Sequence, residues 1–225
     1  MQSTTTLPDM VTEINVNIDS STYYTINTEY VGLKRILDIL IAVIVVALVL
    51  SWLSLILAIL IRLESKGTVF FRQSRTGYLG KDFTILKYRT MYETNEYDEP
   101  CLHSMGNEDR RITRIGRFLR KTRIDEFPQF INVLFGEMSV VGPRPLAKYD
   151  VDQLMKAVPD DFKQILMIKP GITSIGQVKI GYAISITDLV NRLMCDKEYI
   201  SKMSFSYDCI IIFKTIGVMM KGSGI

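Results

Sequence analysis

The sequence is poor in the residues that several common active sites require. Of its 225 residues, one is His and three are Cys: Cys101, Cys195 and Cys209. Zinc hydrolases, triads built on His and disulfide-stabilised scaffolds all need more of these residues than the chain holds. The cysteines form no C-x-x-C pair and are odd in number, so we expect buried thiols in a reducing compartment.

The chain also lacks a P-loop and a strong charge of one sign. No G-x-x-x-x-G-K-[ST] motif occurs, which excludes a Walker-type nucleotide site. Lys and Arg number 27 against 24 Asp and Glu, and 48% of residues are hydrophobic, which excludes a polyionic tail protein and disorder throughout. At about 150 residues per domain, the length predicts one domain with an appendage.

One long apolar segment dominates the sequence. From Ile39 to Ile61 the chain has 23 residues without a charge. A helix of this length spans about 34 Å, enough for a hydrocarbon core of about 30 Å. The segment is too long and begins too far from Met1 for a cleaved signal peptide. Because it is apolar on every side, it also differs from the buried helix of a soluble protein. We predict a membrane helix over 32–63.

The distribution of positive charge orients this helix. Residues 62–81 hold five Lys and Arg, whereas only Lys34 and Arg35 precede the apolar segment. The positive-inside rule therefore places the C-terminal part in the cytoplasm. We expect a polar tail over 1–31, the membrane helix over 32–63 and a cytosolic domain over 64–225. The tail lies outside if the helix spans the membrane, and inside if the helix turns back.

The remaining pattern predicts a mixture of short strands and helices. In the tail, residues 11–18 fit either one short strand or a poorly ordered segment. We then expect a hairpin of strands 67–73 and 82–90 with a glycine-bearing turn at 76–81, followed by a loop over 92–110. Next come helices over 113–121 and about 125–136, a strand at 139–141 and a helix over about 148–167. A loop over 169–174 and an apolar helix over 208–220 complete the prediction. Pro128 suits a first helical turn and Gly136 a helix C-terminus. The final helix either packs against the domain or lies on the membrane surface.

A basic segment at 110–123 offers several chemical interpretations. Its seven cations are Arg110, Arg111, Arg114, Arg117, Arg120, Lys121 and Arg123. Apolar residues interleave with them at helical spacing, giving one apolar and one cationic face. The cations could form a solvated face, a patch for anionic lipid or nucleic acid, or a pocket for a phosphorylated substrate. The residues that follow favour the pocket.

Asp125 and Glu126 come directly after this basic segment. A carboxylate at a helix N-terminus among arginines should have a lowered pKa and be ionised. Such a group suits either Mg²⁺ binding or nucleophilic attack on phosphorus, although helix capping alone would also account for it. Arg144, fixed between two prolines in GPRP, is either a phosphate ligand or part of a rigid turn. Lys87 and Arg89 add two cations at the end of the second predicted strand.

Several motifs together resemble one family. They are KRILDILIA (34–42), FRQSRTG (71–77), FTILKYRTM (83–91), the long block RITRIGRFLRKTRIDEFPQFINVLFGEMSVVGPRP (111–145) and KPGIT (169–173). Over roughly 32–225 the chain resembles the bacterial sugar transferases, the monotopic phosphoglycosyl transferases. The resemblance implies a membrane-associated α+β fold. It would have an N-terminal re-entrant membrane helix and a small, mostly helical cytosolic domain with a short β-hairpin and surface amphipathic helices.

The resemblance also implies an activity and a set of site residues. Such enzymes transfer sugar 1-phosphate from a UDP-sugar to a polyprenyl (undecaprenyl) phosphate and release UMP. By resemblance, Asp125 is the nucleophile that forms an aspartyl-phosphosugar intermediate and contacts Mg²⁺, and Glu126 assists it. The expected phosphate-binding residues are Arg120, Arg144, Arg89 and Lys87, and Thr173 and Gln177 belong to the nucleotide-sugar loop.

The implied setting is the bacterial inner membrane, with the catalytic domain on the cytoplasmic face. The expected partners are the UDP-sugar, the polyprenyl phosphate and the membrane, with no nucleic acid. A homodimer stays open.

The chain departs from the family pattern at three places. Ser51-Trp52 stands where the family usually has Ser-Pro at the middle of the membrane helix, so a simple span is the alternative to a re-entrant helix. Side-chain bonds from Ser51 and Ser54 to backbone carbonyls could still bend it. Thr76 replaces a common proline. In the loop PGITSIGQVKIGY, Ser174 and Gly181 replace the usual Gly and Arg.

The altered loop raises one alternative function, a catalytically weak membrane scaffold for glycan-assembly enzymes. The basic segment raises another, a membrane-anchored protein that binds lipid or nucleic acid.

Overall fold

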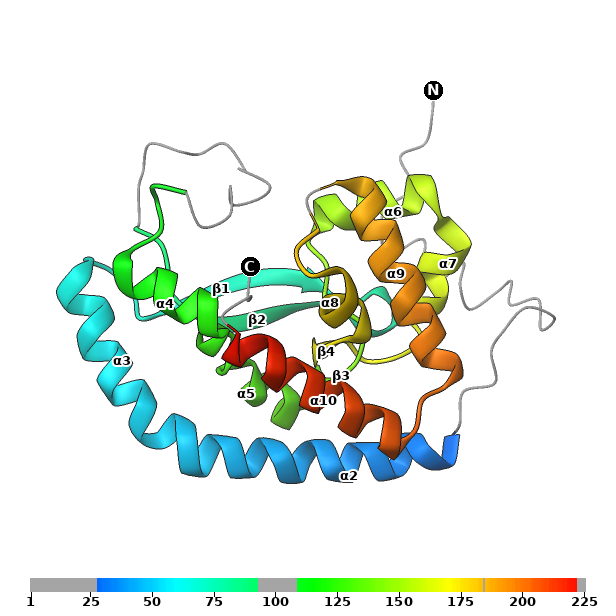
Figure 1. Cartoon of the computed structure of the whole chain (residues 1–225), viewed down its shortest axis with the longest axis horizontal. Coiled ribbons are helices and arrows are strands. Elements are labelled where there is room, and N and C mark those ends of the chain that lie inside the picture. Colours follow the sequence, from blue (N-terminus) through cyan, green and yellow to red (C-terminus); the bar gives the residue numbers. More distant parts are fainter. Residues whose placement is uncertain (1–27, 93–108, 184, 222–225) are drawn as a thin grey trace.

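The computed structural model of the chain describes residues 28–92, 109–183 and 185–221 (Figure 1). The strand or tail predicted at 11–18, most of the loop predicted at 92–110, and Cys101 lie outside the described residues.

The apolar segment forms one long helix in three parts. They are α2 (Thr28–Val45), a π-helical segment η1 (Val46–Leu50) and α3 (Ser51–Glu64). In the part of the chain that the structure describes, this is the single helix long and apolar enough to cross a membrane. Figure 1 shows that its direction changes between α2 and α3.

The bend occurs without proline because the backbone ladder changes at η1. The Ser51 N–H donates to the carbonyl of Val46, five residues earlier, as in a π-bulge. The Ser51 hydroxyl donates to the Ala47 carbonyl at 2.7 Å, and the Trp52 indole N–H donates to the Leu48 carbonyl at 2.8 Å. The expected back-bond of Ser51 is therefore present, whereas the Ser54 hydroxyl pairs with the Tyr88 hydroxyl at 2.6 Å.

A two-stranded hairpin follows the long helix, as predicted. Strand β1 (Phe70–Thr76) pairs antiparallel with β2 (Asp82–Tyr88), and the 3₁₀ turn η2 (Tyr78–Gly80) joins them. Arg75 lies opposite Phe83, and Lys87 lies opposite Phe71. Because these positions share the odd-numbered face of the hairpin, Arg75 and Lys87 lie on the same side.

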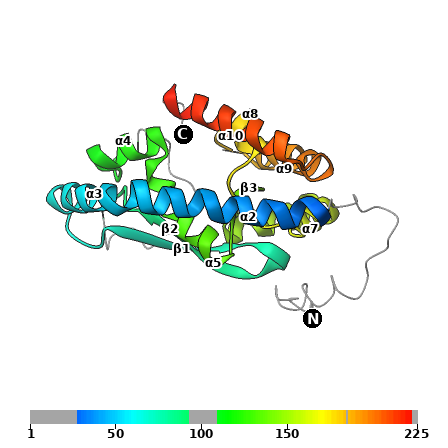
Figure 2. The ribbon, with the colours of Figure 1, turned by 90° about the horizontal axis from the view of Figure 1, so that it is seen from below.

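The rest of the described chain is mainly helical. It comprises α4 (Arg114–Thr122), η4 (Ile124–Glu126), α5 (Gln129–Phe135), β3 (Ser139–Val141), α6 (Lys148–Ala157), α7 (Pro159–Ile165), β4 (Gly171–Thr173), α8 (Ile175–Ile180), α9 (Ile186–Ser201) and α10 (Phe205–Met220). Strands β3 and β4 pair in parallel. Seen from below, α2 and α3 run across the domain, with the hairpin on one side and α10 on the other (Figure 2). The final helix packs inward at Ile211 and exposes Phe213 and Met220.

Three predicted elements differ from the structure. The helix predicted over 125–136 begins at Gln129, because Arg123 adopts a left-handed conformation (φ 56°) and a 3₁₀ turn follows; it ends at Gly136 as predicted. The single helix predicted over 148–167 is two helices, because Val158 before Pro159 is non-helical (φ −145°, ψ 62°). The loop predicted over 169–174 contains β4.

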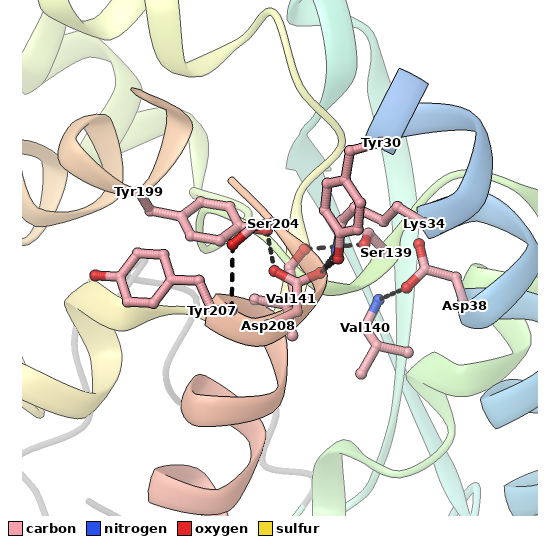
Figure 3. A network of polar contacts seen from close by, with 10 residues as sticks. All are labelled: Tyr30, Lys34, Asp38, Ser139, Val140, Val141, Tyr199, Ser204, Tyr207 and Asp208. Carbon is pink, nitrogen blue, oxygen red and sulfur yellow. Dashed lines mark hydrogen bonds and ion pairs between the residues drawn. The ribbon is translucent and has the colours of Figure 1, made fainter. Parts of the chain in front are cut away.

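Polar side chains attach α2 to the helical domain (Figure 3). The Tyr30 hydroxyl and the Lys34 ammonium donate to Asp208 Oδ2 of α10 at 2.7 and 2.5 Å. The Tyr199 hydroxyl of α9 donates to Asp208 Oδ1 at 2.5 Å. Farther along α2, Asp38 accepts a hydrogen bond from the backbone N–H of Val140 in β3. Because these groups are buried, the first three turns of the long helix are firmly docked.

The other end of the long helix is attached to the same domain. Glu64 accepts hydrogen bonds from the backbone N–H groups of Arg114 and Ile115, at the start of α4. The Arg89 guanidinium donates to the carbonyls of Ser65 and Lys66 at 2.7 and 2.6 Å. Both ends of the long helix therefore contact one body of the protein.

Candidate active site

The adjacent carboxylates Asp125 and Glu126 occupy the short turn η4, between α4 and α5. The left-handed residue Arg123 ends α4 and turns the chain into η4, and its carbonyl accepts the Glu126 N–H at 3.2 Å. Asp125 is 9% exposed and Glu126 is 7% exposed. A tight turn thus holds two carboxylates side by side in largely buried positions.

Glu126 is paired with two cations from distant parts of the chain. Lys87 Nζ, at the end of β2, lies 2.6 Å from Glu126 Oε1, and Arg144 Nη2, in the turn after β3, lies 3.2 Å from the same oxygen. Burial favours the neutral acid, but the charges of Lys87 and Arg144 outweigh it and lower the pKa of Glu126. Glu126 is therefore ionised and fixed.

Asp125 differs from its neighbour. Among the described residues, none donates a hydrogen bond to its carboxylate. Burial raises the pKa of Asp125 to about 6 and the charge of Glu126 adds to this, while Lys87, Arg120 and Arg144 oppose it. The prediction of a lowered pKa is wrong, because desolvation outweighs the nearby cations. At pH 7 a carboxyl with this pKa is still about ten to one ionised.

Three further arginines lie near these groups: Arg75 and Arg123 near Glu126, and Arg192 near Arg144. Arg123 belongs to the basic segment considered above, whereas sequence reasoning did not select Arg75 or Arg192. Burial, followed by the charge of Arg144, lowers the pKa of both Arg75 and Arg192 to about 10. Burial also lowers the pKa of Arg123, although the charge of Glu126 opposes the shift. Strand alternation in FRQSRTG could have identified Arg75 as a partner of Lys87. No local signal marks Arg192, which reaches the site from α9.

The basic segment divides between the site and the surface. Arg120 lies close enough to Asp125 for its charge to lower that pKa, and Arg123 acts similarly on Glu126. Arg114, Arg117 and Lys121 are exposed on the outer face of α4. Arg120 and Arg123 thus lie near the carboxylates, whereas the other three face outward; the phosphate-pocket and surface interpretations stay predictions for these two groups.

Three predicted site residues lie elsewhere. Arg89 is 5% exposed and its guanidinium donates to the chain just after α3, so the structure does not bring it to the carboxylate pair. The Thr173 hydroxyl lies 2.6 Å from the Thr215 hydroxyl of α10. Gln177 is buried in α8, and its side-chain amide has no hydrogen-bond partner among the described residues.

The donor set for a metal ion is small. In the described ranges, no group of three or more His, Cys, Asp or Glu is arranged to hold a metal. Glu126 is occupied by Lys87 and Arg144, whereas no residue within the described ranges donates a hydrogen bond to the carboxylate of Asp125. Mg²⁺ commonly binds one or two carboxylates together with substrate phosphates and water. The residues therefore fit Mg²⁺ held by Asp125 jointly with a phosphorylated substrate.

The chain is similar to proteins of known name. Residues 29–222 match the family model described as bacterial sugar transferase. A UDP-N-acetylgalactosamine-undecaprenyl-phosphate N-acetylgalactosaminephosphotransferase of Aeromonas hydrophila is 42% identical over 195 residues, covering 87% of this chain. A UDP-glucose:undecaprenyl-phosphate glucose-1-phosphate transferase of Caulobacter vibrioides is 38% identical over 81% of this chain. The exopolysaccharide production protein ExoY of Sinorhizobium fredii is 31% identical over 85% of it.

The share of each relative that the match covers varies. The chain spans 45% of the Aeromonas protein, 68% of the Caulobacter protein and 87% of the Sinorhizobium protein.

Proposed function

Because the chain belongs to the bacterial sugar transferase family, we propose that it transfers a sugar 1-phosphate from a UDP-sugar to undecaprenyl phosphate and releases UMP. This would be the first membrane step of polysaccharide or glycoconjugate synthesis, at the cytoplasmic face of a bacterial inner membrane. The observation that carries the proposal is the contrast between the two carboxylates. Glu126 is paired, whereas Asp125 lies among cations and accepts no hydrogen bond from any residue that the structure describes. The names of the Aeromonas and Caulobacter relatives, which contain a UDP-sugar and undecaprenyl phosphate, support the choice of these two substrates.

In the first half-reaction, an Asp125 oxygen attacks the β-phosphorus of the UDP-sugar. The bond from this phosphorus to the oxygen that bridges the two phosphates breaks, and its electron pair leaves on UMP. The product is an aspartyl-phosphosugar. Asp125 needs no base because its pKa of about 6 leaves it mostly ionised at neutral pH. Arg120 and Arg144 lie where they can stabilise charge on the phosphoryl oxygens.

In the second half-reaction, a phosphate oxygen of undecaprenyl phosphate attacks the same phosphorus. The acyl phosphate bond breaks, and Asp125 leaves as a carboxylate. Glu126 keeps Arg144 and Lys87 in place through both halves, because it is ionised and paired with each. When bound, Mg²⁺ supplies positive charge at the donor phosphates, and Asp125 is the residue that would hold it.

We also propose that the long helix is re-entrant. A spanning helix has its two ends on opposite faces of the membrane. Here Lys34 near one end pairs with Asp208, and Glu64 at the other end accepts hydrogen bonds from the start of α4. Contacts of both ends with one domain favour a helix that enters and leaves on the cytoplasmic side. The apolar side chains exposed between these ends would then face lipid.

Asp125→Asn tests the chemistry. Membranes containing the protein, with Mg²⁺ and undecaprenyl phosphate, are incubated with a panel of UDP-sugars, and UMP is measured. We expect one or more sugars to give UMP with the wild type and a loss of at least 10³-fold with Asp125→Asn, which removes the nucleophile. Asp152→Asn, an exposed position on α6, is the matched control. UMP release that survives Asp125→Asn would exclude the covalent mechanism.

The same assay separates the enzyme from the other functions considered. A membrane scaffold would give no UMP with any sugar while binding the membrane normally. Binding of lipid or nucleic acid through Arg114 and Arg117 would weaken steeply with salt and would be unaffected by Asp125→Asn.

A further inference from the structure

The short helix α8 packs against α9 (Figure 1). Two residues of α9, one helical turn apart, hold its two ends. At its N-terminus, Asp196 Oδ1 accepts the backbone N–H of Gly176 at 2.8 Å. At its C-terminus, the Arg192 guanidinium donates to the carbonyl of Gly181. A Cβ on Gly176 would lie 2.5 Å from Arg192 Cγ and 2.9 Å from Asp196 Oδ1. Glycine is therefore required here for α8 to approach α9 this closely.

The same carboxylate also faces the turn that carries Arg144. The backbone N–H of Arg144 and the Ser174 hydroxyl are hydrogen-bond donors to Asp196, in addition to Gly176. Asp196 is 3% exposed, so water does not replace these donors. Its carboxylate thus connects α9, the start of α8 and the turn 142–145.

Arg144 links this buried carboxylate to the active site. Its backbone faces Asp196, and its guanidinium donates to Glu126 Oε1 at 3.2 Å. The turn is otherwise held by backbone bonds to β4: Gly142 donates to Thr173, and Gly171 donates to Pro143. The Arg144 backbone N–H also faces the Asp196 carboxylate, and this contact acts to lower the pKa of Asp196.

We propose that Asp196 is a positioning residue for Arg144 in the phosphoryl transfer proposed above. It fixes the backbone at residue 144, and this fixes where the guanidinium meets Glu126 and the donor diphosphate. Arg192 supports it by holding the far end of α8. A shift of about 1 Å at such a group is enough to slow phosphoryl transfer substantially. The expected effect on phosphoryl transfer rests on the proposed function, whereas the contacts of Asp196 are independent of it.

A double-mutant cycle between Asp196 and Arg144 tests the role. The four proteins are wild type, Asp196→Asn, Arg144→Ala and the double variant, each assayed for UMP release and for binding of UDP by calorimetry. We expect Asp196→Asn to lower kcat/KM and UDP affinity about tenfold in the wild-type background, and less than twofold when Arg144 is already Ala. Glu198→Gln, exposed on the same helix, should change neither by more than twofold.

The cycle distinguishes positioning from a purely structural role. If Asp196→Asn lowers both quantities by the same factor in both backgrounds, it acts independently of Arg144, and the proposal is overturned. If Asp196→Asn does not accumulate as folded protein, the cycle is run with Asp196→Glu, which keeps the charge. A wild type that binds UDP and shows the coupling but releases no UMP would defeat the proposed function and support the positioning role.

Discussion

Asp125 and Glu126 are neighbours in the chain, yet their surroundings shift their pKa values in opposite directions. Both are buried, but only Glu126 has a direct ion pair, with Lys87 and Arg144. The pKa of Glu126 is lowered, and that of Asp125 is raised to about 6. Glu126 therefore holds two cations in place, and under the proposed mechanism Asp125 supplies the attacking oxygen.

Lys87→Met should move the acidic limb of the pH profile. The charge of Lys87 is the strongest influence that lowers the pKa of Asp125. Without it that pKa rises, so a smaller fraction of Asp125 is ionised at a given acidic pH. We expect the acidic limb of UMP release to shift upward by about one pH unit. Lys81→Met, exposed in the same hairpin, should leave it in place. An unchanged limb in Lys87→Met would mean that Asp125 does not limit the rate at acidic pH.

Sequence reasoning found the residues that lie close together in the chain. Asp125, Glu126 and Arg120 belong to one contiguous block, and Arg144 lies in a distinctive turn. The sign of the pKa shift at Asp125 depends on burial, which residue spacing does not reveal. Arg192 and Asp196 come from a helix that the pattern did not predict, and tertiary packing alone brings them to the site. The hydrogen bonds of Arg89 to the carbonyls of Ser65 and Lys66 join residues more than twenty positions apart in the chain, so the sequence alone does not reveal them.

At the scale of elements, the bend of the long helix lies at the π-helical segment, where Ser51 and Trp52 stand in place of the Ser-Pro pair that the family resemblance leads us to expect. The hydroxyl of Ser51 and the indole of Trp52 donate to carbonyls at the π-helical segment. In an apolar environment, a backbone carbonyl that accepts no hydrogen bond raises the free energy of the folded state. The two side chains thus compensate for the altered backbone ladder.

Replacing both donors should destabilise the protein. Each hydrogen bond contributes about 1 kcal/mol. The double variant Ser51→Ala/Trp52→Phe should therefore lower the Tm of the purified protein by about 5 °C. Trp52→Pro serves as the comparison. Because proline is compatible with a helix that is already bent, we expect this variant to lower the Tm by less than the double variant does. Equal Tm values for the double variant and the wild type would show that these bonds do not stabilise the bend.

Periodicity and turn residues predicted most elements but not their interruptions. The hairpin, α4, β3 and the end of α5 at Gly136 follow from local patterns. The left-handed Arg123 does not, because an arginine rarely adopts that conformation. The pairing that defines β4 joins residues about thirty positions apart in the chain, so a local pattern reads it as a loop.

For the whole molecule, the re-entrant arrangement predicts the location of the N-terminus. A cysteine introduced at Thr5 should resist a membrane-impermeant thiol reagent applied to intact cells, because a helix that returns keeps its leading segment inside. Labelling should appear once the cells are permeabilised. Strong labelling of intact cells, with Lys202→Cys on the domain protected, would instead establish a spanning helix.

The attachment of both helix ends to one domain has a consequence for the choice of lipid. A spanning helix must match its apolar length to bilayer thickness, and it tilts or deforms the lipid when the two differ. A helix that leaves by the leaflet it entered has no opposite boundary to reach. Its depth is then set by Lys34–Asp208 and by the Glu64 contacts, which belong to the protein itself. In the proposed arrangement, the distance from the lipid surface to Asp125 should therefore stay constant between thin and thick membranes.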